Sequence, residues 1–163
     1  MPELVKLLDL EDEVVTADAL NCQYEIANAI VEKKGNYVLA VKGNKKDLYE
    51  DIVDYFNEKT IEQIIAKEEL YRKTVEKSHS NIEKREYFMI LGVDYLKNNC
   101  GKNYNKLKSI GMVKRTMENL ITGEVTIENR YYINSIYNID LFAKTVRKEW
   151  CIENNLHWHL DYP

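Results

Sequence analysis

The chain has 163 residues, of which 45% are hydrophobic and 31% are charged, and its formal net charge is -4. These values are typical of one globular domain with its own core, and they exclude a disordered chain. No apolar run approaches the roughly 18 residues of a membrane span, and the start, MPELVKLLDLEDEVV, has no signal-peptide pattern. Three widely spaced cysteines without a CxxC pair predict a reduced, cytoplasmic protein without structural zinc.

The first part of the chain predicts a strand, a helix and a second strand. EVVTADAL is apolar and β-branched and predicts a short buried strand that ends at Asp18. NCQYEIANAIVEKKG repeats apolar residues at helical spacing and offers Gly35 as a C-cap, and NYVLAVK is a second strand. This order favours a parallel pair of strands joined by a right-handed crossover. Asp18 would then lie where open α/β sheets usually bind ligands, outside the carboxyl ends of the strands.

The middle of the chain changes from a helical to a β pattern. Leu48, Ile52 and Phe56 predict an amphipathic helix, and a second helical stretch reaches about Leu70. Alternating patterns then predict four strands, with NLITGE as the turn between the last two. These strands are YRKTVEK, NIEKREYFMI, LKSIGMVKRTME and EVTIENRYYINSI.

We therefore expect a single α/β domain in three parts. They are a βαβ unit over about residues 1–45, a helical and then β-rich insertion over about 46–137, and a final helix over about 138–163. Within the insertion, the stretch from Lys97 to Arg115 holds six basic residues and no acidic one. It is either a solvated loop or a patch that neutralises phosphates, and both interpretations stay open.

The last helix carries the run RKEWCIENNLHWHLDYP, which contains both tryptophans and two of the three histidines. On a helix, Glu153 and His157 share one side while His159 points away, so a His-x-His metal pair is disfavoured. Two interpretations remain. The helix packs into the core with Glu153 solvated, or Glu153 joins Asp18 as a hard-oxygen ligand for magnesium in phosphoryl transfer.

Three blocks resemble the H-repeat-associated group of insertion-sequence transposases. They are VVTADALNCQYEIANAIVEKKGNYVLAVKGNKKDLYEDI, SIGMVKRTMENLITGEVTIENRYYINSI and VRKEWCIENNLHWHLD, in the family's order and over essentially the whole chain. The group belongs to the DDE transposases, which have an RNase H-like core interrupted by a β-rich insertion. The resemblance implies a partial RNase H-like core here, built from the βαβ unit and the C-terminal helix.

The resemblance also implies functional residues. Asp18 matches the second acid of the family's triad and Glu153 matches the last, and together with a third acid they would hold two magnesium ions for cleavage and transfer of DNA strands in transposition. No Asp matches the first position, which belongs upstream of the segment that reads MPELV here. The chain looks truncated at both ends and is expected to be inactive alone. Glu149 replaces a histidine of the family, and its negative charge would disfavour phosphate binding at this surface.

The implied partner is double-stranded DNA, at transposon ends and at the target, with no membrane partner and with a homodimer expected only of an intact relative. Basic residues that could contact phosphates are Lys42, Lys45, Lys46, Lys106, Lys108, Lys114, Arg115 and Arg147. Two alternatives stay open beside the transposase interpretation. One is a non-catalytic DNA-binding or interaction module, and the other is a translated transposon remnant without a function.

Overall fold

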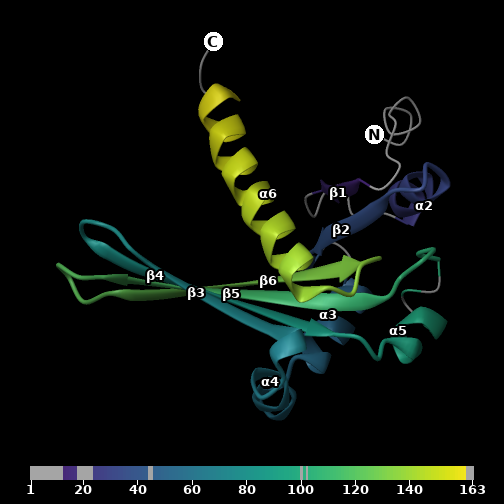
Figure 1. Cartoon of the computed structure of the whole chain (residues 1–163), viewed down its shortest axis with the longest axis horizontal. Helices are drawn as coiled ribbons and strands as arrows, with labels where there is room; N and C mark the ends of the chain where they lie inside the picture. Colours follow the sequence, from purple (N-terminus) through teal and green to yellow (C-terminus); the bar gives the residue numbers. More distant parts are fainter. Residues whose placement is uncertain (1–12, 18–23, 44–45, 100, 102, 161–163) are drawn as a thin grey trace.

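The structure is a computed structural model that describes residues 13–17, 24–43, 46–99, 101 and 103–160, without the side chains of 97, 98 and 150–160. Six strands form one sheet in the order β1-β2-β6-β5-β4-β3 (Figure 1). The strands are β1 (Val14–Ala17), β2 (Asn36–Val41), β3 (Tyr71–Lys77), β4 (Asn81–Ile90), β5 (Ser109–Asn119) and β6 (Val125–Asn134). The helices are α2 (Tyr24–Glu32), α3 (Lys46–Tyr55), α4 (Glu58–Ile65), η3 (Glu68–Leu70), α5 (Asp94–Asn98) and α6 (Ile139–Leu160).

The expected parallel pair of strands is confirmed, because β1 and β2 run parallel with α2 between them in the chain. Helix α2 ends one residue earlier than Gly35 suggested. Lys34 adopts the left-handed conformation (φ 60°) and its N–H donates to the Val31 carbonyl, while the Gly35 N–H donates to the Ile30 carbonyl. This is a Schellman motif in which lysine, rather than glycine, takes the left-handed position.

The four strands predicted in the middle of the chain are confirmed as β3 to β6, which pair antiparallel in chain order. The turn NLITGE is confirmed too, with Gly123 at φ 77°. Strand β6 also pairs antiparallel with β2, so all six strands share one sheet and the fold is mixed α/β. The division of the chain into a core and an insertion, and the RNase H-like character of the core, stay predictions.

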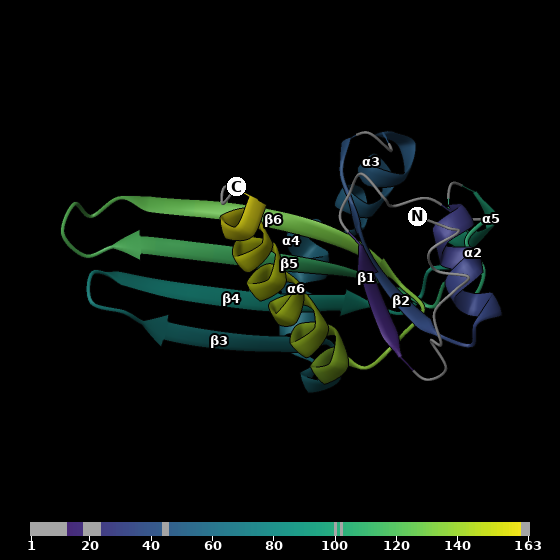
Figure 2. The same ribbon diagram turned by 90° about the horizontal axis from the view of Figure 1, so that it is seen from above.

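Side chains alternate between two cores on opposite faces of the sheet. In β2, Leu39 and Val41 join the core under α2, α3 and α4, whereas Val38 and Ala40 join the core under α6. Figure 2 shows α6 lying across its face of the sheet, while β3 to β6 extend well beyond it to two exposed hairpin ends. Within the described part of the chain, no helix is both long and apolar enough to cross a membrane.

Helix α6 starts where expected and is held tightly against the sheet. The Asn138 carboxamide oxygen accepts from the Leu141 N–H at 3.0 Å, as an N-cap does. Phe142 is fully buried against Gly111 of β5, where an added Cβ would lie no more than 3.0 Å from three atoms of the phenyl ring. A glycine is needed at that point of the strand because the ring rests directly on the backbone.

Candidate functional site

A groove separates β1 from α6 at the edge of the sheet. Helix α6 contacts β1 as well as β2, β3 and β4, and the groove beside β1 has a volume of about 320 Å³. It is lined by Glu13, Val14, Thr16, Leu141, Lys144, Thr145, Lys148 and Glu149. Carboxylates, hydroxyls and two lysines therefore share one cleft between the first strand and the last helix.

Of the two predicted catalytic acids, one lies on the helix that borders this groove and the other directly follows the bordering strand in sequence; neither side chain is among the described ones. Asp18 directly follows Ala17, the last residue of β1, and lies outside the described residues. Glu153 lies on α6, one turn beyond Glu149, and its side chain is also outside the description. In the described part of the chain, no group of three or more His, Cys, Asp or Glu side chains is placed to hold a metal ion.

The expectation that Glu149 adds a surface charge is not met. Glu149 is only 7% exposed and lines the groove beside β1. Position 149 continues the stripe of Ile139, Phe142 and Val146, which recurs every three or four residues and faces the sheet. The periodicity of the helix therefore places this carboxylate inside the molecule.

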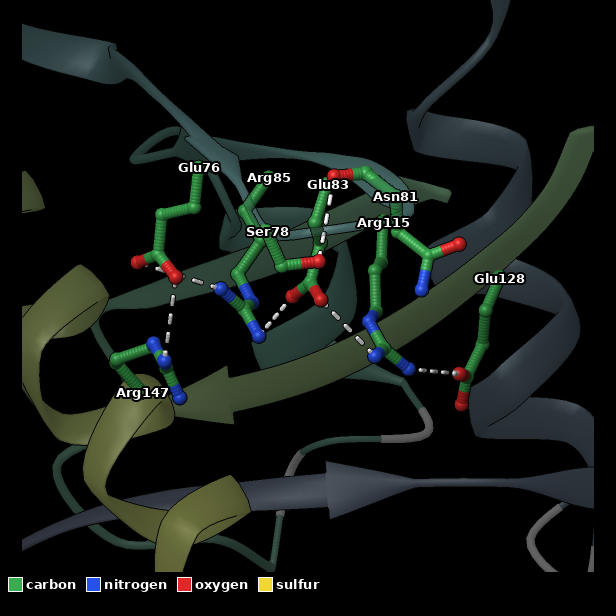
Figure 3. Close-up of polar contacts among 8 residues, drawn as sticks. All are labelled: Glu76, Ser78, Asn81, Glu83, Arg85, Arg115, Glu128 and Arg147. Carbon is green, nitrogen blue, oxygen red and sulfur yellow. Dashed lines mark hydrogen bonds and ion pairs between the residues drawn. The ribbon is translucent and has the colours of Figure 1, made fainter. Parts of the chain in front are cut away.

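Beside the first turns of α6, the same face of the sheet carries an arginine–glutamate network that crosses four strands (Figure 3). Arg147 of α6 and Arg85 of β4 both contact Glu76 of β3 at 3.8 Å. The remaining ion pairs are Arg85 with Glu83, Arg115 with Glu83 at 3.2 Å, Arg115 with Glu128 at 3.9 Å, and Arg130 with Glu128 at 2.9 Å. Arg72 adds an ion pair of 2.8 Å to Asp140 in the first turn of α6.

Glu83 lies at the centre of this network. Burial by itself raises the pKa of the Glu83 carboxyl, but the hydrogen bond from Arg115 and the charges of Arg85, Arg115 and Arg147 outweigh burial, so the pKa is lowered. The carboxylate therefore stays ionised between its arginine partners, which is the state that holds the strands and α6 together.

The predicted DNA-binding basic residues do not form one surface. Lys114 and Arg115 are adjacent in β5 and lie on opposite faces, and Arg115 is engaged in the network. Lys106 (φ 63°) donates to the Asn36 side chain at 2.9 Å, and Lys108 lies 5.0 Å from the centre of the Tyr137 ring.

The other predicted basic residues lie elsewhere. Lys42 and Lys46 are exposed after β2 and at the start of α3, Arg147 is on α6, and Lys45 lies outside the described residues. The acids of the network and its arginines Arg72, Arg85 and Arg130 were not predicted from the sequence. Glu83 and Arg85 are two residues apart in β4, so the strand pattern predicts that they lie on the same face. It does not predict which residues of the neighbouring strands they contact.

Comparisons with known proteins show which proteins the chain is similar to. No family model and no solved structure matches it. It is 33% identical over 99% of its length to "Putative protein YbfL" of Escherichia coli K12. It is 32% identical over the same share to "H repeat-associated putative transposase YhhI" of that strain, and 34% identical to "Putative transposase YncI" of Escherichia coli O157:H7. The chain spans about two fifths of the length of these relatives (42% for the first two and 41% for the third). The expected resemblance is confirmed: over 99% of its own length the chain is similar to relatives that include an H repeat-associated putative transposase and a second putative transposase.

Proposed function

We propose that this chain is part of a DNA transposase and contributes two active-site carboxylates, Asp18 and Glu153, for cleavage and transfer of DNA strands. The observation that carries the proposal is the groove between β1 and α6. Asp18 follows the end of β1 in sequence, and Glu153 follows the groove-lining Glu149 by one helical turn. Glu153 thus belongs to one of the two elements that border the cleft, and Asp18 directly follows the other in sequence.

Carboxylates are the ligands that magnesium prefers, so the donor set fits a magnesium site formed by Asp18, Glu153 and a third acid. Magnesium bound there would stabilise negative charge on the reacting phosphate and on the leaving oxygen. Lys144 and Lys148 line the same groove. Their ammonium groups would hold a phosphodiester beside the carboxylates without reading its sequence.

Metal binding tests the assigned acids without relying on activity. We expect the 163-residue chain to bind Mn²⁺ in a calorimetric titration, and we expect Asp18→Asn and Glu153→Gln each to weaken that binding at least tenfold. Glu62→Gln, at an exposed position of α4, is the control and should leave the affinity unchanged. Equal Mn²⁺ affinity in all four proteins would contradict the proposed ligands.

A strand-cleavage assay tests the chemistry. Two of the three acids implied by the resemblance are matched in this sequence, and a catalytic set that acts as a unit loses most of its activity when one member is missing. We therefore expect the chain alone to nick duplex DNA very weakly with magnesium. Robust nicking that disappears in Asp18→Asn would overturn this expectation of weak activity, while supporting the role of Asp18.

A second candidate function is a non-catalytic DNA-binding module. The observation that favours it is a group of four lysines on the face of the sheet opposite α6, Lys73, Lys77, Lys84 and Lys114. Within the described part of the chain, Lys84 forms an ion pair with Glu86 at 3.6 Å and the other three form none. For this function, duplex binding should persist in Glu153→Gln. Binding that requires Glu153 would favour the catalytic interpretation instead.

A further inference from the structure

We propose that the face of β3, β4 and β5 opposite α6 binds the phosphate backbone of duplex DNA without regard to sequence. This proposal rests on the proposed function for the choice of DNA as partner. We call this surface the lysine face, and it consists of Lys73, Lys77, Lys84 and Lys114 with the residues between them. Figures 1 and 2 show that the outer halves of these strands project beyond the helices.

The strand register brings these lysines together, because residues directly opposite each other in an antiparallel pair share a face. Lys73 is opposite Glu86, which is in turn opposite Lys114. In the next row outward, Lys84 is opposite Val75, and in the row after it Lys77 is opposite Ile82. Four lysines from three neighbouring strands therefore point to one side.

The lysine face has more positive charge than its own acids neutralise. In these rows the acids are Glu86 and Glu118. Glu86 is 9% exposed, accepts from the Tyr71 hydroxyl at 2.7 Å, and lies 3.6 Å from the Lys84 ammonium. Among the described residues, Lys73, Lys77 and Lys114 have no recorded ion pair.

The spacing of the lysines suits an extended polyanion. Neighbouring strands lie about 4.8 Å apart and successive residues on one face about 6.7 Å apart. Lys84 and Lys114 are therefore about 8 Å apart at the backbone and Lys73 and Lys77 about 13 Å. Flexible lysine stems can adjust these separations to phosphates along a duplex, whose charge density is about one per 1.7 Å of axis.

The opposite face is a poorer phosphate site although it carries more arginines. There, a phosphate would have to displace Glu76, Glu83 or Glu128 from the guanidinium groups that they already contact. On the lysine face no such exchange is needed at Lys73, Lys77 or Lys114. A phosphate can replace water and counterions at these three residues.

A second copy of the chain is a less suitable occupant than DNA. Val75, Val125 and Ile127 are 53–59% exposed on this face and could cover apolar surface. Stacking two copies through it, however, would bring lysines of one copy toward lysines of the other, and like charges across an interface disfavour association. Beside DNA, the same apolar groups and the lysine stems would rest against sugars while the ammonium groups reach phosphates.

The test is fluorescence anisotropy of a labelled duplex of about 20 base pairs, titrated with the 163-residue chain at several salt concentrations. The variant is Lys73→Gln/Lys77→Gln/Lys114→Gln. We expect at least tenfold weaker binding at low salt, and a salt slope smaller by about 3, because each lost phosphate contact removes roughly 0.9 from the slope. Two duplexes of unrelated sequence should bind within about twofold of each other, since phosphate contacts carry no sequence information.

The matched control is Lys34→Gln/Lys59→Gln/Lys67→Gln, which removes the same charge from exposed positions elsewhere. It should change affinity less than threefold, and Glu118→Gln should strengthen binding. Circular dichroism verifies that each variant is folded. Equal weakening by the two triple variants, no duplex binding at low salt, or tighter binding to polyglutamate than to DNA would each overturn the proposal. The Mn²⁺ titration does not involve this face, so the two proposals fail separately.

Discussion

The two faces of the long strands β3 to β6 carry basic residues in opposite ways. Opposite α6, Lys73, Lys77 and Lys114 make no recorded ion pair within the described part of the chain. Beneath and beside α6, each of the five arginines 72, 85, 115, 130 and 147 contacts at least one carboxylate. The same strands thus hold one face that is closed by internal charge pairs and another that is open to an outside anion.

The choice of residue explains part of this difference. A guanidinium group has several donors in a planar fork, so one arginine can bridge two carboxylates, as Arg85 does between Glu76 and Glu83. A lysine ammonium is a strongly hydrated point charge and gains less from a fixed partner. A basic residue count therefore says little about DNA binding until the internal partners are known.

The largest expected effect is removal of the central carboxylate of the arginine–glutamate network. Glu83→Gln would leave Arg85, whose side chain is 7% exposed, and Arg115 with less neutralising charge. We expect the free energy of unfolding to fall by about 2–4 kcal/mol, somewhat less than for a fully buried pair because the Glu83 side chain is 16% exposed. Urea denaturation measures this.

Glu118→Gln is the matched change on the lysine face. Glu118 is exposed there, so the free energy of unfolding should change by less than about 0.5 kcal/mol. If Glu83→Gln and Glu118→Gln lowered the free energy of unfolding by similar amounts, the proposed difference between the two faces would be contradicted.

The next effect concerns the contact that fixes α6 to its face. Gly111→Ala would force a Cβ into the Phe142 ring, and we expect a loss of about 1–3 kcal/mol in the free energy of unfolding. Phe142→Leu in the same chain should recover part of the loss by making room. Gly92→Ala, where nothing lies within 4 Å of the added Cβ, is the control and should be close to neutral.

Lowering the pH should remove the stabilisation that Glu83 gives to the arginine–glutamate network. The pKa of Glu83 is below its ordinary value of 4.5 in the folded chain, so its contribution to stability is full above about pH 4.5 and is lost as pH falls toward the lowered pKa. The stability gap between the wild type and Glu83→Gln should therefore be constant near neutral pH and narrow below about pH 4.5. A gap that persists unchanged to pH 2 in denaturation curves would contradict this assignment.

The smallest expected effect is the loss, at high pH, of the stabilisation by the hydrogen bond between Tyr71 and Glu86 on the other face of the sheet. Burial, followed by the hydrogen bond to Glu86 and the charge of Glu86, raises the pKa of Tyr71 above its ordinary value of 10.0. The stabilisation by the neutral hydroxyl is complete below about pH 10 and is lost as pH rises toward the raised pKa. Tyr71→Phe should cost about 1 kcal/mol at neutral pH, with the gap narrowing above pH 10. An equal gap at pH 7 and pH 11 would be inconsistent with this pairing.

The sequence predicted local structure well because the local signals are strong. Alternation in β3 and β4 marked both strands with the observed limits, and the apolar spacing of Leu48, Ile52 and Phe56 marked α3. Helix α6 begins at Ile139, close to the expected start of the final helix. The short helix α5 was missed because five residues give too little periodicity to recognise. Gly35 was predicted as the C-cap of α2, but Lys34 takes the left-handed position, because the hydrogen bonds to the Ile30 and Val31 carbonyls decide where the helix ends.

The surfaces could not be predicted to the same degree. Lys114 and Arg115 looked like parts of one basic patch because they are adjacent in sequence, yet a strand places them on opposite faces. Their partners depend on which strands are neighbours and in which register, and Glu128 reaches Arg115 only because β6 follows β5 in the sheet. The roles of Asp18 and Glu153 come from family resemblance and stay predictions.

The order of the strands also bears on how the chain reaches its folded state. Strands β3, β4, β5 and β6 are neighbours both in sequence and in the sheet. Pairing them therefore brings together residues that are separated by short stretches of chain. The pairing of β2 with β6 joins Val38 to Asn134 across most of the chain, and such a closure is entropically costly and slow. During refolding, we expect the backbone amides of β3 to β6 to become protected from hydrogen exchange before those of β1 and β2. The surface that carries the lysines would then form before the strand that leads to Asp18 is in place.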